Sequence, residues 1–70
     1  MTVYTIHTAS GSIYELEVSS SFGMLTGTGT AGPIQLDAEL ADVRLPVIGE
    51  RYWFAGAYLS RVVAVEVAAR

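Results

Sequence analysis

The glycines between residues 27 and 32 have the spacing of a dinucleotide-binding loop. The segment Gly27-Thr28-Gly29-Thr30-Ala31-Gly32 matches the pattern GxGxxG, in which the amides at the start of a helix bind a pyrophosphate. That chemistry needs an amphipathic helix directly after the glycines and a doubly wound sheet around them. Pro33 and an alternating apolar and polar stretch follow instead, in a chain of only 70 residues. We therefore interpret the segment as a strand end or a loop and expect no cofactor.

His7 is the single histidine of the chain, and an imidazole can act as a general base near neutral pH. The first predicted hairpin places it on the solvent face, diagonally across from Glu15, which would orient it. The chain contains no Cys, and no Ser lies in a nucleophile signature such as GxSxG. We interpret His7 as an exposed residue loosely paired with an acid. We expect no catalytic residues and no enzyme activity.

Three carboxylates, Asp37, Glu39 and Asp42, have side chains that could bind a hard cation. Their spacing lacks the calcium-loop pattern and its glycine. A structural zinc site needs several thiolate or imidazole ligands, and the chain offers one His and no Cys. We interpret these acids as a solvated strand edge or helix face and expect no metal site.

Aromatic side chains can stack the bases of a single-stranded nucleic acid when basic residues are interleaved with them. The chain has seven aromatic residues: Tyr4, Tyr14, Phe22, Tyr52, Trp53, Phe54 and Tyr58. Its only cations are four arginines, Arg44, Arg51, Arg61 and Arg70, and the net charge is −3. This balance disfavours a phosphate-tracking surface, so nucleic acid is an unexpected partner and most of the aromatics are predicted to be core. Trp53 and Tyr58 are the best candidates for a contact surface, with Arg51 beside Trp53 as an anchor.

The positions of these residues follow from a predicted hairpin at the start of the chain. Residues 3–8 and 13–18 are alternating runs rich in β-branched and aromatic residues. A two-residue loop between them would mix apolar and acidic side chains on each face. A three-residue loop over residues 9–11 avoids this, with Gly11 in the left-handed conformation. It places Tyr4, Ile6, Tyr14 and Leu16 on one face and Thr5, His7, Glu15 and Glu17 on the other.

The rest of the chain alternates strands with connections. We expect a strand at 22–30, a loop at 46–50, a strand at 51–55 with Tyr52 and Phe54 facing away from Trp53, a turn at 56–60 and a last strand at 61–68. Residues 34–43 are ambiguous. Alternation over 34–40 favours a strand, whereas Leu36, Leu40 and Val43 have helical spacing. We favour the strand, because Gly-Pro precedes the segment and Pro46 follows it.

The last strand carries apolar residues on nearly both faces, which is typical of a barrel or sandwich centre or of a subunit interface. Its residues Val62 and Val65 are therefore interface candidates, together with Arg51, Trp53 and Tyr58. About six short antiparallel strands predict one all-β domain over residues 1–70. A small closed barrel or a compact sandwich is the economical architecture. Within it, the alternative to a strand at residues 36–43 is one short helix.

The composition indicates a chain that associates. Hydrophobic residues make up 51% and charged residues 16%, against the roughly 25% charged residues of an ordinary soluble domain. A domain this short gains only about 3–5 kcal/mol from its own core and cannot add disulfides here. We expect a homo-oligomer or a bound protein partner, and a tightly packed monomer is the alternative. No signal-peptide pattern or membrane span is present, so the expected location is the cytoplasm.

Three segments carry a resemblance to known sequences. These are Ser12-Ile13-Tyr14-Glu15-Leu16, Pro46-Val47-Ile48-Gly49-Glu50-Arg51 and Ser60-Arg61-Val62-Val63-Ala64-Val65-Glu66. The chain resembles a group of short, uncharacterised β proteins of actinobacteria and their bacteriophages, although the Gly/Thr-rich segment replaces a more charged one. The resemblance implies a phage accessory protein acting in the host cytoplasm and assigns no chemistry. Together with the composition, it predicts a non-enzymatic, self-associating protein that binds a host factor, or else an assembly component of a phage particle.

Overall fold

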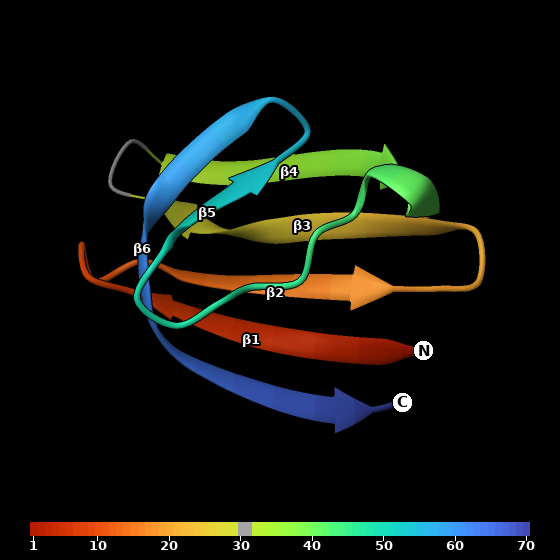
Figure 1. The fold of residues 1–70 in the computed structure, drawn as a ribbon, viewed down its shortest axis with the longest axis horizontal. Coiled ribbons are helices and arrows are strands. Elements are labelled where there is room, and N and C mark those ends of the chain that lie inside the picture. Colours follow the sequence, from red (N-terminus) through yellow and green to blue (C-terminus); the bar gives the residue numbers. More distant parts are fainter. Residues whose placement is uncertain (30–31) are drawn as a thin grey trace.

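The computed structural model describes residues 1–29 and 32–70, and these form one antiparallel sheet (Figure 1). Its strands are β1 (Thr2–Thr8), β2 (Ile13–Val18), β3 (Phe22–Gly29), β4 (Gly32–Glu39), β5 (Arg51–Phe54) and β6 (Ala57–Ala69). Their order in the sheet is β4-β3-β2-β1-β6-β5. The expected all-β class is therefore confirmed. The central part of the glycine motif, Thr30 and Ala31, lies outside the described residues.

The sheet curls because β6 is long enough to serve two partners. The end of β6 pairs with β1 and its beginning pairs with β5, with register irregularities at His7/Thr8 and between Arg51 and Trp53. The β5–β6 hairpin consequently crosses in front of the sheet (Figure 1). In the described part of the chain, β4 and β5 are the two edges and do not pair with each other. The architecture is thus a half-barrel, which refines the expected closed barrel or sandwich.

The hydrophobic core lies between the curved sheet and this hairpin. Leu16 and Leu25 face it from the sheet, while Tyr52 and Phe54 close it from β5, with ring centroids 6.2 Å apart. The fully or nearly fully buried members of the cluster are Ile6, Tyr14, Leu16, Leu25, Tyr52, Phe54 and Val62. Tyr52 and Phe54 face inward and Trp53 is only partly buried, so the predicted alternation of this strand is confirmed.

The first hairpin has the predicted register. Tyr4 lies opposite Leu16 and Ile6 opposite Tyr14, which requires the three-residue loop. The Gly11 amide donates to the Thr8 carbonyl at 3.0 Å, and Gly11 has a φ of 89°. A left-handed glycine at this position lets the two strands keep their twist through a short loop.

The ambiguous segment contains both kinds of structure. Its first part belongs to β4, which confirms the favoured strand, and a single 3₁₀ turn follows at Leu40–Asp42. The Val43 side chain after this turn packs where Gly23 has no side chain, since a Cβ on Gly23 would lie 2.6 Å from Val43 Cγ2. The helical spacing therefore reflects one turn that brings Val43 back onto the core.

One expectation for the end of the chain is wrong. The connection before β6 is a turn at residues 55–56 and not at 56–60, since Ala55 and Gly56 have φ of 49° and 85° and β6 begins at Ala57. Two positive φ values match the twist of a tight hairpin, and only one of the two residues is glycine. The last strand carries exposed apolar side chains, since Val63 is 49% exposed and Val67 63% exposed in the single chain.

Gly27 is the glycine of the sheet at which a side chain would clash with backbone atoms. A Cβ there would lie 2.5 Å from the Ile13 carbonyl oxygen and 2.9 Å from Tyr14 Cα, both backbone atoms. We expect Gly27→Ala to lower the free energy of unfolding by about 3 kcal/mol, because the β2–β3 pair must move apart. Urea denaturation measures this loss. Thr26→Ala on the opposite face of β3 is the control, and an equally small loss for both variants would contradict the close approach.

Candidate functional site

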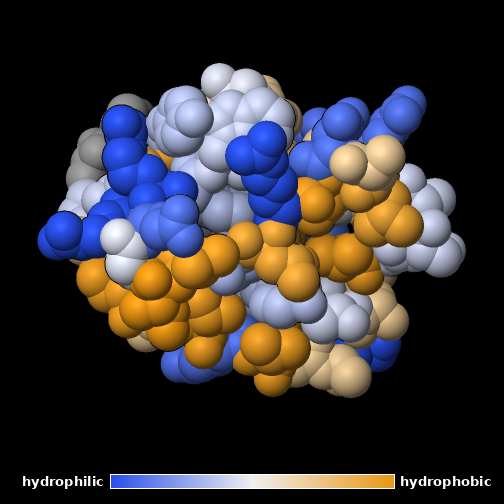
Figure 2. Space-filling view, viewed as in Figure 1, coloured by the Kyte–Doolittle hydropathy of each residue, from blue (hydrophilic) through white to orange (hydrophobic). Residues whose placement is uncertain are grey.

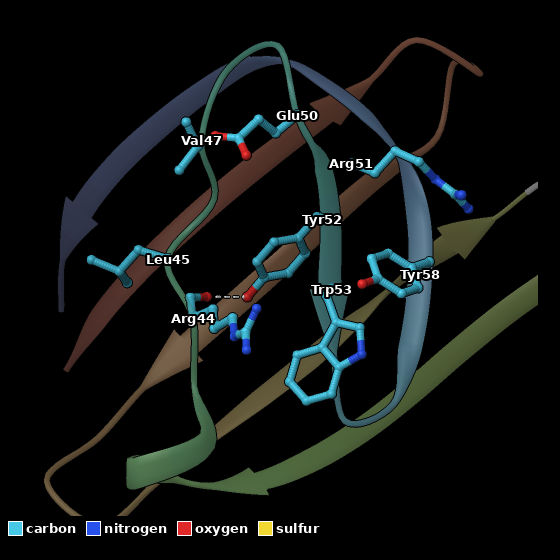
Figure 3. Close-up of a pocket in the computed structure, with 8 residues that line it drawn as sticks. All are labelled: Arg44, Leu45, Val47, Glu50, Arg51, Tyr52, Trp53 and Tyr58. Atoms are coloured by element: carbon cyan, nitrogen blue, oxygen red, sulfur yellow. Dashed lines mark hydrogen bonds between the residues drawn. The ribbon is translucent and has the colours of Figure 1, made fainter.

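The loop after the 3₁₀ turn and the β5–β6 hairpin enclose an open pocket of about 290 Å³ (Figure 3). It is lined by Arg44, Leu45, Val47, Glu50, Arg51, Tyr52, Trp53 and Tyr58. The loop reaches this position because its Glu50 carbonyl accepts from the Val62 amide at 2.9 Å and its Gly49 amide donates to the Val62 carbonyl at 2.8 Å. Backbone bonds to β6 thus hold the loop beside β5.

Two arginines and two aromatic rings form a continuous row across this pocket. The guanidinium of Arg44 lies 4.8 Å from the centroid of the Trp53 ring, and that of Arg51 lies 5.2 Å from the Tyr58 ring. Trp53 and Tyr58 are cross-strand partners on the hairpin. We call Arg44, Trp53, Tyr58 and Arg51 the arginine–aromatic row. Each such cation–π contact stabilises its geometry by about 0.5–1 kcal/mol at an exposed site.

Hydrogen bonds to backbone carbonyls orient both ends of the row. The Arg51 Nε donates to the Leu59 carbonyl at 3.1 Å. The Tyr52 hydroxyl donates to the Arg44 carbonyl at 2.6 Å, which fixes the loop against β5 (Figure 3). The first bond orients the Arg51 guanidinium, and the second holds the backbone of Arg44 in place.

The arginines of the row form no ion pair among the described residues, although Glu50 lines the same pocket. Arg51 lies directly opposite Arg61 across the β5–β6 ladder, and like charges in such a pair destabilise a sheet. The ion pairs among the described residues join His7 to Glu66 and Arg70 to Glu15. Arg44, Arg51 and Arg61 therefore have no carboxylate partner there, and together they present three positive charges to an incoming anion.

Exposed aliphatic side chains border the row. Leu45, Val47 and Ile48 are 55%, 54% and 63% exposed, although each is large and apolar. Figure 2 shows apolar residues gathered at the lower left of this face, where the same loop runs in Figure 1, beside a group of hydrophilic residues. A contiguous apolar surface next to oriented charges is typical of a binding face.

The structure brings together three of the five residues expected from the sequence at an interface. Arg51, Trp53 and Tyr58 meet in the row. Val62 is completely buried and Val65 is partly buried against the core, so their side chains stabilise the fold and Val62 has no surface to offer a partner. The sequence could not separate these roles, because a strand that packs on the core and a strand at a subunit interface are both rich in apolar residues.

Sequence reasoning missed the contribution of the loop. Arg44 and the three aliphatic residues that follow it come from a segment expected only to connect two strands. The available signal was the run of large apolar residues around Pro46, in a loop where polar residues are usual.

His7 pairs with a different acid from the one expected. Its Nε2 lies 3.5 Å from Glu66 Oε1 on β6, and Glu15 contacts Arg70 Nη2 at 3.8 Å instead. His7 is thus loosely paired with an acid, as expected, but the acid is Glu66 and not Glu15. The expectation considered only β2, whereas β6 pairs with the other side of β1 and places Glu66 opposite Thr5, diagonal to His7.

The described residues contain no group of three or more His, Cys, Asp or Glu side chains arranged to hold a metal ion. Nor is any helix among them long and apolar enough to cross a bilayer. Comparisons with protein-family models, with curated proteins and with solved structures find no match to this chain. The arginine–aromatic row, with its apolar border, is thus the feature from which a function must be argued.

The Tyr52 hydroxyl, which binds the Arg44 carbonyl, makes the stability of the fold depend on pH at high pH. Burial raises its pKa from 10.0 to about 12, because the charged tyrosinate is poorly solvated there. The neutral form therefore contributes stability that is present below pH 10.0 and is lost as the pH rises towards 12.

We expect Tyr52→Phe to lower the free energy of unfolding at neutral pH by about 1 kcal/mol, the net value of one hydrogen bond. The variant should also lose less stability than the wild type between pH 10 and 12. Urea denaturation at several pH values measures both effects. Tyr58→Phe, whose ring is 64% exposed, is the control. A wild type and a Tyr52→Phe variant with parallel pH profiles would show that Tyr52 is not responsible.

Proposed function

We propose that this protein is a non-enzymatic interaction module that associates with itself and binds a protein surface through the arginine–aromatic row and its apolar border. One observation carries the proposal: two arginines are already stacked on Trp53 and Tyr58, beside exposed aliphatic side chains, and neither takes part in an ion pair among the described residues. Trp, Tyr and Arg are the residue types that contribute most to protein–protein affinity.

The residues of the pocket favour binding over chemistry. Arginine does not exchange protons at physiological pH, and the tyrosine and tryptophan side chains here provide contact area with little loss of conformational entropy. The hydrogen bond of the Arg51 side chain to Leu59, and that of Tyr52 to the backbone of Arg44, reduce the entropy that would be lost on binding. A surface of this kind selects a partner by shape and charge.

The charges of the row favour an acidic protein surface as the partner. A nucleic acid would also present anions, but the chain has a net charge of −3, so most of its surface would repel a phosphate backbone. The exposed aliphatic border adds an apolar contact that a phosphate backbone does not use. A protein with carboxylates next to apolar side chains matches both features.

The resemblance to short proteins of actinobacteria and their phages supplies a biological setting for this proposal. It suggests a phage accessory protein that acts on a host factor in the cytoplasm. A structural component of a phage particle is the alternative, and self-association into a ring or array would favour it.

The test is the dependence of molar mass on protein concentration, measured by size-exclusion chromatography with light scattering. We expect the wild type to exceed its monomer mass of 7.5 kDa and to dissociate on dilution. Tyr58→Ala and Arg51→Ala should each raise the dissociation constant at least about tenfold, because they remove centrally placed contacts.

Matched controls lie elsewhere on the surface. Ile13→Ala removes an apolar side chain that is 50% exposed, and Arg70→Ala removes a cation outside the row. Neither should change the dissociation constant by more than about twofold, as is usual for surface positions outside an interface. A wild type that stays monomeric at every concentration, or controls that weaken association as much as the row variants, would refute self-association through this surface.

A further inference from the structure

A second, acidic surface lies on the opposite side of the molecule from the arginine–aromatic row. Glu17, Met24 and Asp37 are cross-strand neighbours on β2, β3 and β4, and Phe22 faces Glu39 in the same way. We call these five residues the acidic face. Phe22 is 44% exposed, and Asp37 and Glu39 are exposed as well. Three negative charges thus surround two apolar side chains.

The alternation of side chains fixes the direction of this surface. Leu16, Leu25 and Leu36 alternate with the residues of the acidic face and point into or pack against the core. On the other side of the core, Trp53 alternates with the buried Tyr52 and Phe54 and points away from it. The two surfaces therefore look outward from opposite sides of one half-barrel.

The two surfaces match each other in charge and composition. The row side has three arginines that take part in no ion pair of the described residues, namely Arg44, Arg51 and Arg61. The acidic face has three carboxylates, and none of them takes part in the ion pairs of the described residues. Each surface also has large apolar or aromatic side chains between its charges. Each surface of one copy thus has the opposite charge to the other surface of a second copy.

From this complementarity we propose that the protein assembles head to tail, with the arginine–aromatic row of one copy on the acidic face of the next. The inference rests on the proposed self-association and specifies its geometry. Such a contact is heterologous, because the two copies use different surfaces, and it continues into a ring or a filament. Each contact takes about 800 Å² from each partner, roughly a fifth of the chain's 4229 Å² surface.

Two variants that each disable one surface provide the test. The row variant combines Arg51→Ala with Arg61→Ala, and the face variant combines Asp37→Asn with Glu39→Gln. All four side chains are exposed, so both variants should keep the fold, which circular dichroism verifies. Each variant alone should be monomeric by light scattering at concentrations where the wild type assembles.

Mixing the two variants distinguishes a heterologous contact from a symmetric one. The intact row of the face variant can then bind the intact acidic face of the row variant, and the disabled surfaces prevent further growth. We expect the mixture to form a dimer of about twice the 7.5 kDa of one chain. Wild-type assembly should also weaken between about 0.1 M and 1 M NaCl, where the screening length falls from about 10 Å to about 3 Å.

Each outcome has one meaning. A mixture that stays monomeric, while the wild type assembles and the row variant does not, would overturn the head-to-tail geometry and leave self-association through the row standing. A face variant that assembles like the wild type would do the same. A wild type that is monomeric throughout would overturn both.

If such a monomer instead bound a fluorescein-labelled oligothymidylate in a Trp53-dependent manner, the row would serve nucleic acid. Glu15→Gln with Arg70→Ala is the control pair and should leave assembly unchanged.

Discussion

The structure depends on how a single curved sheet covers its own apolar face. One sheet of this size has no second layer to pack against, since the helical structure among the described residues is a single 3₁₀ turn at Leu40–Asp42. The chain solves this by continuing β6 past the end of β1 and folding the β5–β6 hairpin back over the sheet. Tyr52 and Phe54 then complete the core at 3% and 0% exposure. Burial of these two rings is what closes the half-barrel.

The same closure determines where the arginine–aromatic row lies. Because strand side chains alternate, a hairpin that buries Tyr52 and Phe54 must turn Trp53 outward. Trp53 meets its cross-strand partner Tyr58 there, and the loop that leads into β5 brings Arg44 over the tryptophan ring. The loop is held in this place by the Tyr52 hydroxyl and by backbone bonds to β6. The core and the arginine–aromatic row are thus two faces of one hairpin.

Local rules predicted the elements well and the long-range contacts poorly. The register of the first hairpin followed from keeping Ile6 and Tyr14 on one face, and the structure confirms it. The pairing of β1 with β6 joins residues far apart in sequence, so the contact of His7 with Glu66 could not be anticipated from neighbours in the chain. For the same reason the apolar pattern around Val62 indicated burial, but it could not show whether Val62 is buried in the core of the chain or at an interface. The turn at Ala55 was missed because an alanine at positive φ follows no local preference.

Arg51 and Arg61 lie opposite each other across the β5–β6 ladder. A like-charged cross-strand pair costs up to about 1 kcal/mol, in a domain whose core supplies only about 3–5 kcal/mol. The cost is avoidable, since an acid at either Arg51 or Arg61 would form a favourable pair in the same ladder. Arg51 is instead held over Tyr58 by its bond to the Leu59 carbonyl. An anionic surface that binds both guanidinium groups would convert this repulsion into an attraction shared between two chains. Association would then remove a strain that the isolated chain carries, and it would cover the exposed aliphatic border of the loop in the same step.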